Sequence, residues 1–287
     1  MSKRKAKNKI GDSQIKRYVG LHLGGGKSDK TCMAVLEYYP THKKVFLSRL
    51  HSQIGPEKDQ SSDAKLHHLL TVSEAPMDRL AIDAPLTWPK CMRCELPCPG
   101  YESCGEPEIK WMWRWHKKRG KSKKPNKIFS PYTQRCVELH LAQEMEKSFF
   151  PGDALGANMA PLLARATFLL RRLGSEALEV YPPLSLWRMG ISLGISKGTL
   201  TFAKHSAEGE DNRLTILKKF VDSGLLFIYE QDLRTMAQHA DAFDALICGL
   251  TAYLNDQDLC EPRPQGFPKS ETWICVPRQD INFTGLR

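Results

Sequence analysis

The chain has 287 residues, 41% of them hydrophobic and 26% charged, which suits a globular protein with one substantial core. It has no run of about 18 apolar residues to span a bilayer, and its N-terminus lacks the apolar stretch of a secretory signal. We therefore predict a cytoplasmic protein with no membrane partner. The nine cysteines then favour free thiols or metal ligands over a disulfide framework.

The net charge of +10 is concentrated in residues 1–17 and 110–127. Basic patches attract nucleic acid by releasing its condensed counterions, so this distribution predicts a polyanionic partner, DNA or RNA. For the N-terminal segment the alternative is a lysine-rich tail that only aids solubility. We expect a basic disordered tail over 1–17, one domain over 18–277 and a second tail over 278–287.

The first half of the chain predicts an antiparallel meander, then a helix and a parallel strand. Residues 17–24, 30–40 and 43–54 alternate like three strands. Residues 61–74 combine a Ser/Asp start with apolar positions at helical spacing. Residues 78–86 form a short apolar run stopped by proline, which is typical of a buried parallel strand.

The second half begins with a change of composition, to Cys, Pro, Trp and Lys with little periodicity, which we interpret as an insertion over about 88–127. Beyond it we expect helices at 132–149, 158–174, 212–224 and 241–254, a strand at 177–186 and an edge strand at 270–277. The layout is that of an α/β protein with an antiparallel start and a parallel continuation.

The stretch GLHLGGGKSDKT has the look of a phosphate-binding loop, but its spacing is wrong. The pattern G-x-x-x-x-G-K-[ST] requires a glycine where the chain has Leu21, and Gly20 comes one residue too early. Because Gly24 to Gly26 also suit a tight turn, the pattern favours a hairpin between the first two strands over nucleotide binding.

Four carboxylates stand in settings where a charge is costly. Asp83 closes an apolar strand, Glu179 lies in a second apolar stretch, and Asp241 and Asp244 are three apart on one helix face. Two carboxylates about 4 Å apart repel by roughly 4 kcal/mol at an effective dielectric of 20, so gathering them makes sense mainly around a cation. The alternative is that Asp83 and Glu179 each cap or pair with a local group.

Six motifs follow one another in the chain: RYVGLHLGGGKSDKT, LAIDAPLTWP, PYTQRCVE, NMAPLLARATFLLRRL, LEVYPPLSLWRMG and DAFDALICGLTAYL. In this order they resemble an uncharacterised domain family of predicted ribonuclease H-like nucleases, within the superfamily of ribonuclease H, Holliday-junction resolvases and transposases. The resemblance runs from Tyr18 to Pro277. It implies a ribonuclease H-like mixed five-stranded sheet of order 3-2-1-4-5, flanked by helices, and an acidic cluster that binds two divalent ions, Mg²⁺ or Mn²⁺, for phosphodiester hydrolysis.

The resemblance also assigns roles. The second acidic position of the family matches Asp83, the third matches Glu179, and the C-terminal helix pair matches Asp241 and Asp244. The chain departs at His22, which stands where the family carries an aspartate that reaches both ions. Because an imidazole nitrogen binds one ion and suits softer metals, we expect a site with one ion or a softer ion, or a site with impaired catalysis.

The predicted insertion begins with Cys91, Cys94, Cys98 and Cys104 in a Pro/Gly-rich segment. C-x-x-C is a good chelating pair, and four thiolates make a closed tetrahedral zinc site that would organise a loop lacking a core of its own. We therefore predict a structural zinc ion. The remaining spacing is irregular for common zinc modules, which leaves free thiols and an iron–sulfur cluster as alternatives.

Indoles and cations alternate directly after the cysteines, and stacking on single-stranded bases is worth about 1 to 3 kcal/mol per base while cations follow the phosphates. The alternative is that the tryptophans pack the insertion onto the domain and the lysines form a mobile loop. Two arginines in the family-like motifs are further candidates to hold a phosphate. The predicted nucleic-acid-binding residues are Trp111, Trp113, Arg114, Trp115, Lys117, Lys118, Lys121, Lys124, Arg135 and Arg165.

From these features we predict a metal-dependent nuclease whose catalytic residues and divalent-metal ligands are Asp83, Glu179, Asp241, Asp244 and His22. Two other functions fit the same sequence. One is a catalytically impaired nucleic-acid-binding protein of the same fold. The other is an actin-like ATP-binding phosphotransferase, whose first strand also ends in a glycine turn.

Overall fold

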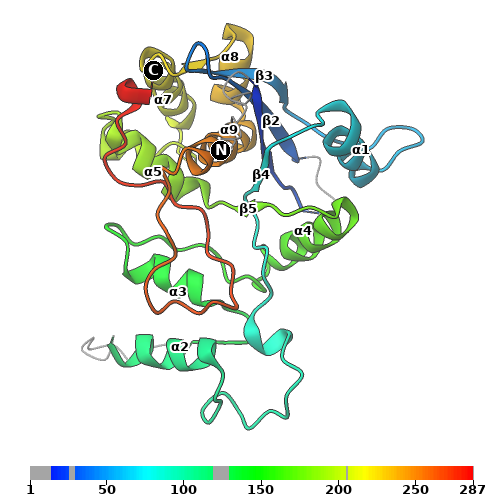
Figure 1. Ribbon diagram of the computed structural model, residues 1–287, viewed down its shortest axis with the longest axis vertical. Helices are drawn as coiled ribbons and strands as arrows, with labels where there is room; N and C mark the ends of the chain where they lie inside the picture. Colours follow the sequence, from blue (N-terminus) through cyan, green and yellow to red (C-terminus); the bar gives the residue numbers. More distant parts are fainter. Residues whose placement is uncertain (1–13, 26–29, 119–128, 205, 287) are drawn as a thin grey trace, which may run out of the picture.

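The computed structural model describes residues 14–25, 30–118, 129–204 and 206–286. Within them the chain forms an α/β protein, in which one mixed sheet is flanked by helices on both faces (Figure 1). Among the described residues no helix combines the length and the apolar character needed to cross a membrane.

The predicted antiparallel meander is confirmed: β1 (Lys16–His22), β2 (Cys32–Tyr39) and β3 (Lys44–His51) pair in sequence. The predicted parallel continuation is confirmed as well, since β4 (Arg79–Ile82) pairs with β1 and β5 (Leu178–Glu179) pairs with β4. Residues 26–29, which include part of the predicted glycine turn, lie outside the described residues.

The described sheet has six strands in the order β5-β4-β1-β2-β3-β6, so the prediction of five strands was wrong. The additional strand is β6 (Leu226–Phe227), which pairs with β3 in parallel. The prediction of an edge strand at 270–277 was also wrong. The Cys275 N–H donates to the Glu179 carbonyl at 2.8 Å while the Val276 carbonyl accepts from Glu261 at 2.7 Å, so neighbouring residues bond to different segments and no continuous ladder forms.

Strand alternation divides the core into two layers. On β1, Val19 and Leu21 face one helix layer, and Tyr18 faces the other. The first layer holds α1 (Ser62–His68), its continuation η1 (Leu69–Ser73) and α4 (Ala160–Leu173), which ends at Gly174 in the left-handed conformation as predicted. The second layer holds α5 (Pro182–Ser192), α6 (Lys197–Thr201), α7 (Gly209–Asp222), α8 (Glu230–Gln238) and α9 (Ala240–Asp256).

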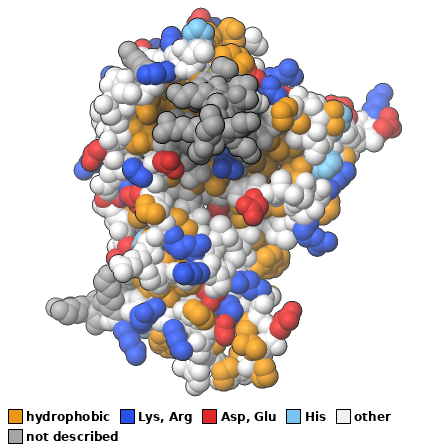
Figure 2. Space-filling model, viewed as in Figure 1, with side chains coloured by type: hydrophobic (Ala, Val, Ile, Leu, Met, Phe, Trp, Pro, Cys, Tyr) orange, Lys and Arg blue, Asp and Glu red, His pale blue; other side chains and the backbone are white. Residues whose placement is uncertain are grey.

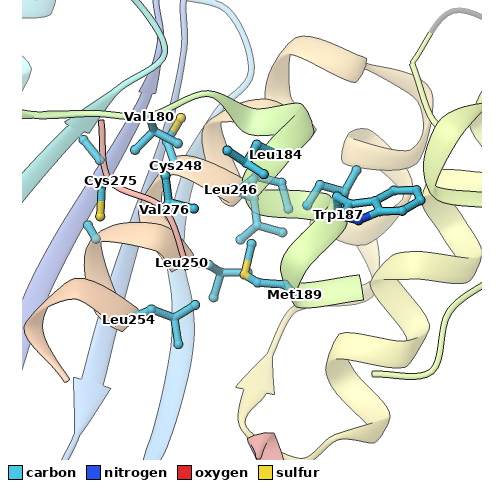
Figure 3. Close-up of a cluster of buried hydrophobic side chains, with 14 of the residues drawn as sticks. Val180, Leu184, Trp187, Met189, Leu246, Cys248, Leu250, Leu254, Cys275 and Val276 are labelled. Carbon is cyan, nitrogen blue, oxygen red and sulfur yellow. The ribbon is translucent and has the colours of Figure 1, made fainter. Parts of the chain in front are cut away.

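The largest helix, α9, is buried along almost its whole length. In Figure 3 its side chains Leu246 and Leu250 lie beside Leu184 and Met189 of α5. The strand predicted at 177–186 was right only for Leu178–Glu179, because residues 182–186 belong to α5, a helix that the two prolines after β5 concealed in the sequence. These prolines occupy the first turn of the helix, where a missing N–H costs no hydrogen bond.

Two glycines let α9 lie directly against the sheet. A Cβ atom on Gly20 would stand 2.1 Å from the Ala245 carbonyl oxygen and 2.2 Å from the Gly249 nitrogen, far inside contact distance. Gly20 of β1 and Gly249 of α9 thus form a close approach of two backbones. This contact, rather than a phosphate-binding loop, accounts for the glycine at position 20.

The predicted insertion contains a helix that the sequence analysis missed. α2 (Pro107–Lys118) follows the cysteine-rich segment, which itself contains only the short η2 (Lys90–Met92). Ile109, Met112 and Trp115 are buried at helical spacing, but the many cations between them obscured this pattern. Figure 1 shows α2 and α3 (Cys136–Gln143) together at the lower end of the molecule, with the C-terminal segment running past α3 before the short η3 (Phe283–Leu286).

Candidate active site

The candidate site lies where β1 and β4 end. His22 is the last residue of β1 and Asp83 directly follows β4, and because these strands are parallel both residues reach the same edge of the sheet. The Leu23 N–H donates to Asp83 Oδ1 at 2.9 Å, and the Asp83 N–H donates to the Leu21 carbonyl at 3.2 Å. These two bonds fix the Asp83 carboxylate beside the end of β1.

The helix α9 adds two carboxylates from its first turns. His22 lies two residues beyond Gly20 and therefore on the same face of β1, the face that α9 covers. Its Nε2 atom is 3.3 Å from Asp241 Oδ1, and its Nδ1 atom contacts Asp83 Oδ2. The imidazole thus bridges a carboxylate of the sheet edge and a carboxylate of the helix.

Three of the predicted site residues come close enough to share one ion. His22, Asp83 and Asp244 each offer one donor atom, and these atoms all lie within 4.8 Å of one another. Among the described residues this is the one group of histidine, cysteine and acidic side chains with such geometry. Asp241, which touches His22, stands at its rim and is more exposed than Asp83.

A lysine that the sequence analysis missed enters the same site. Lys204, in the loop between α6 and α7, contacts Asp244 Oδ2 with its ammonium group. Its side chain is about one-third exposed, whereas that of Asp244 is buried. The local sequence TFAKHS carries no motif, so only the tertiary structure brings this cation to the carboxylates.

The loop of Lys204 is held in place by Arg213, a buried residue of α7. The Arg213 guanidinium donates to the Ala203 carbonyl at 2.6 Å and to the Ala237 carbonyl at 2.7 Å. It also donates to the Gln238 carbonyl at 3.3 Å. Arg213 therefore ties the residue before Lys204 to the segment that leads into α9. Its position on the apolar face of α7, in register with Ile216 and Phe220, is a sequence signal that could have identified it.

The charges of the site shift one another's protonation. Burial alone would lower the pKa of His22, but the Asp83 carboxylate, with further help from Asp244 and Asp241, outweighs burial and raises it. Burial raises the pKa of Asp244, although the Lys204 ammonium opposes this shift. For Lys204, burial favours the neutral amine, yet the Asp244 carboxylate prevails and raises the pKa. With raised pKa values, His22, Asp244 and Lys204 therefore hold their protons more tightly than the free side chains would.

Two buried thiols beside the carboxylates remain protonated. Burial and the nearby carboxylates raise the pKa of Cys32, the partner of His22 on β2, to about 12. The pKa of Cys248, one turn after Asp244 on α9, is raised for the same reasons. Neither cysteine belongs to the group of donor atoms that could share one ion.

Glu179, the predicted third acidic ligand, lies at the end of β5 and is bonded to an arginine. The Arg135 guanidinium donates to both of its carboxylate oxygens, at 2.7 and 2.8 Å, and the Leu86 N–H donates to one of them at 2.8 Å. Asp83 and Glu179 do line one small cavity of about 30 Å³. Within the described residues Glu179 is not part of the group that could share an ion, so its role as a ligand stays a prediction.

The two arginines proposed to hold phosphate are both buried and make structural bonds. Besides Glu179, Arg135 pairs with Glu138 at 2.6 Å. Burial raises the pKa of Glu138 to about 8, despite this guanidinium. Arg165 donates to the Gly24 carbonyl at 2.6 Å and to Asp63 at 2.8 Å, and so anchors the connection after β1 to α1. Phosphate binding by these arginines stays a prediction.

The predicted nucleic-acid-binding residues of α2 divide into packed rings and exposed cations. Trp115 is buried, and Trp113 stacks on Tyr101 with ring centroids 6.1 Å apart. Trp111 packs edge-on to Phe267 at 5.7 Å. Arg114 and Lys117 are exposed and line a cavity beside the helix. The side chain of Lys118 lies outside the described part of the structure, as do two further predicted residues, Lys121 and Lys124.

The fold and this site define a class: an α/β protein with a histidine and acidic side chains gathered at the carboxyl ends of parallel strands. The chain belongs to the family described as "Protein of unknown function (DUF429)", whose model matches residues 31–269. No curated protein and no solved structure matches the chain.

Proposed function

We propose that this protein is a metal-dependent nuclease of ribonuclease H-like architecture, which hydrolyses phosphodiester bonds with one divalent ion held by His22, Asp83 and Asp244. The observation that carries this proposal is the approach of one donor atom from each of these residues to within 4.8 Å of the others. The three residues come from β1, the end of β4 and α9, so their meeting is a product of the tertiary structure.

The strand arrangement supports the ribonuclease H-like assignment. Read from one edge, five of the six described strands run β3-β2-β1-β4-β5, and β6 extends the sheet beyond β3. The candidate ligands follow β1 and β4 and lie on a helix packed against that sheet, at the carboxyl edge where α/β sheets form their sites.

The charges favour one ion over two. The carboxylates of Asp83, Asp241 and Asp244 face the ammonium of Lys204, which leaves two negative charges when His22 is neutral. One divalent ion neutralises them, whereas a second would leave an excess of positive charge in a half-buried site. The donor set of one imidazole and two carboxylates suits Mn²⁺, Fe²⁺ or Zn²⁺ better than Mg²⁺.

Each group then has a distinct role. A divalent ion bound there would lower the pKa of a coordinated water and polarise a phosphoryl oxygen. Lys204 uses one of its three N–H donors on Asp244, so its remaining donors can bind a non-bridging phosphate oxygen as negative charge develops. Asp241, the more exposed carboxylate, can accept the proton of the attacking water while the bond from phosphorus to the leaving oxygen breaks.

The substrate surface is proposed to lie over α2 and its neighbours. Figure 2 shows lysine and arginine side chains gathered over the lower part of the molecule, where α2 lies in Figure 1. Arg114 and Lys117 are exposed cations of this helix, and phosphate contacts from such residues position a nucleic acid without reading its sequence.

The test is cleavage of fluorescent DNA and RNA, single- and double-stranded, with Mn²⁺, Mg²⁺ or Zn²⁺ in turn. We expect cleavage that requires the metal, is faster with Mn²⁺ than with Mg²⁺, and falls at least 100-fold in Asp83→Asn. The matched control is Asp59→Asn, which removes an exposed carboxylate outside the group that could share an ion and should leave cleavage unchanged.

A second candidate function is nucleic-acid binding without catalysis. One observation favours it: with its raised pKa, a protonated His22 together with Lys204 already offsets most of the carboxylate charge without any ion. Binding of the fluorescent nucleic acids without cleavage under any of the three metals would select this function. The substitution His22→Asp separates the two further, because a competent site given a bridging carboxylate should bind a second Mn²⁺ and cleave faster.

A further inference from the structure

A second metal site is suggested by the cysteine-rich segment, here defined as residues 88–106. Its one regular element is the short η2, and none of its residues belongs to a strand. Large apolar side chains that would normally build a core are exposed instead, with Met92 at 54% and Leu96 at 61% exposure. A segment with so little buried apolar surface needs another source of order.

All four cysteines of this segment line one cavity. Cys91, Cys94, Cys98 and Cys104 surround a space of about 300 Å³ together with apolar side chains that include Ile109 of α2. No disulfide joins them in the structure. Their positions, rather than their spacing alone, therefore place four soft donors around one cavity.

Two ion pairs bring the ends of the segment together at this cavity. Lys90, next to Cys91, pairs with Glu106 at 2.6 Å. Arg93 pairs with the buried carboxylate of Glu108, in the first turn of α2, at 2.7 Å. Lys90 is adjacent to Cys91, and Glu106 follows shortly after Cys104. The pair of Lys90 and Glu106 therefore holds the first and the last cysteine of the set near each other.

The chemistry of the four side chains suits a divalent cation. A bound cation favours the thiolate form of a cysteine and replaces the mutual repulsion of neighbouring thiolates by attraction to the ion.

We propose that Cys91, Cys94, Cys98 and Cys104 bind one structural Zn²⁺ ion as four thiolates, and that this ion fixes the cysteine-rich segment against α2. A tetrahedral site with Zn–S bonds of about 2.3 Å needs sulfur atoms about 3.8 Å apart. No three of the sulfur atoms lie within 4.8 Å of one another, so binding draws the loop inward. Cys98 is exposed and lies in a stretch without regular structure, which gives the loop room for this movement.

The site is independent of the nuclease proposal. Its ligands are thiolates that bind zinc tightly and leave no open position for a substrate, whereas the site of His22 and Asp83 uses an imidazole and carboxylates. Its effect is on α2, which begins at Pro107, shortly after Cys104, and whose exposed residues include Arg114 and Lys117. The zinc ion thereby sets the position of the basic helix.

The test is the zinc content of the full-length protein, measured by elemental analysis after extensive dialysis. We expect one zinc per chain, retained in Asp83→Asn and in Cys260→Ser, a matched half-buried cysteine outside the segment. Zinc should be lost in Cys94→Ser. Absorption spectroscopy at the zinc edge should show four sulfur ligands at about 2.3 Å.

The proposal also has a readout that needs no substitution. Protein stripped of metal should become more sensitive to protease within residues 88–118 and recover on addition of one equivalent of Zn²⁺, and Co²⁺ should give the charge-transfer bands of a tetrathiolate site. Well-folded, zinc-free protein with four free thiols or two disulfides would overturn it. So would an iron–sulfur chromophore, or full zinc retention in a folded Cys94→Ser variant.

Discussion

The acidic site and the cysteine-rich segment both gather metal-binding groups, but they do so in opposite ways. His22, Asp83 and Asp244 come from distant parts of the chain and are held by strand pairing and by the close contact of β1 with α9. The four cysteines come from one short stretch with almost no regular structure. In the first region packing positions the ligands, whereas in the second we propose that the ion does.

This difference has a physical consequence for the free protein. The carboxylates of the acidic site already face His22 and Lys204, so the region can fold and persist without an ion. Among the described residues, the cavity of the cysteine-rich segment is lined by one cationic residue, Lys90, which is already paired with Glu106. Within that part of the chain the thiols therefore have no comparable cation of their own. Metal removal should therefore disturb the structure of the second region and leave the structure of the first intact.

The largest effect is expected from Arg135→Met. This substitution leaves Glu179 and Glu138 buried without their guanidinium partner, which should cost about 3 to 5 kcal/mol in the free energy of unfolding. Urea denaturation measures it. The control is Arg234→Met, which breaks an exposed ion pair within α8 and should cost less than about 1 kcal/mol. Equal losses in the two variants would mean that the network behind the acidic site does not depend on buried charge.

A loss of cleavage of about 100- to 1000-fold is expected for Lys204→Met, since Lys204 is proposed to stabilise charge on the phosphate. Lys204→Arg should restore part of the rate, and Mn²⁺ should still bind at one ion per chain. Lys197→Met, an exposed lysine of α6, serves as the control. Faster cleavage with tighter Mn²⁺ binding in Lys204→Met would instead identify this lysine as a group that blocks the ion.

The close approach that positions α9 can be tested with Gly20→Ala. The added methyl group would lie 2.1 Å from the Ala245 carbonyl oxygen, so α9 must move away from β1 at a cost of about 1 to 3 kcal/mol. Because the movement carries Asp241 and Asp244 away from His22, Mn²⁺ affinity should fall as well. Gly25→Ala is the matched control, since its Cβ atom meets nothing within 4 Å. The two variants should differ clearly in thermal denaturation and in Mn²⁺ titration.

Metal affinity at the acidic site should rise with pH. The pKa of His22 is raised in the folded protein, and its proton must leave before the imidazole binds an ion. Below that pKa the apparent affinity should fall about tenfold per pH unit, and it should level off above it. In the absence of metal the sign is opposite for stability: the contribution of protonated His22 is complete below about pH 6.5 and is lost as pH rises through the folded pKa.

Mn²⁺ titrations at several pH values measure this dependence. The slope should largely disappear in His22→Asp, because an aspartate does not titrate in this range when a cation is near. A wild-type affinity that does not change with pH would show that His22 is not a ligand.

The smallest effect is expected at the basic helix. Lys117→Gln removes one exposed cation of α2, so the slope of log affinity for single-stranded nucleic acid against log salt should decrease by about 0.7. Lys58→Gln, an exposed lysine between β3 and α1, should leave the slope unchanged. If zinc sets the position of α2, zinc removal should reduce the wild-type slope in the same way, which would link the two regions. An unaltered slope in Lys117→Gln would remove this helix from the proposed nucleic-acid surface.

Several parts of the fold followed from local pattern. The meander, the parallel strands β4 and β5, the helix α4 with its glycine end, and the helix α9 were predicted near their observed positions, since each has a clear period of apolar residues. The helices α2 and α5 were missed because lysines and prolines hid their apolar faces. The strand predicted at 270–277 has the right composition, but its hydrogen bonds go to different partners.

The sequence by itself determined which residue types this protein offers for chemistry: carboxylates at the ends of apolar runs, a histidine in the first strand, and four closely spaced cysteines. Only the tertiary structure decided which of them meet. It brings His22, Asp83 and Asp244 together and adds Lys204 from a loop that carries no sequence motif. It also pairs Glu179 with Arg135. The reason is that local spacing fixes the face on which a side chain lies, whereas contacts between distant segments depend on how closely two backbones can approach, as Gly20 and Gly249 permit here.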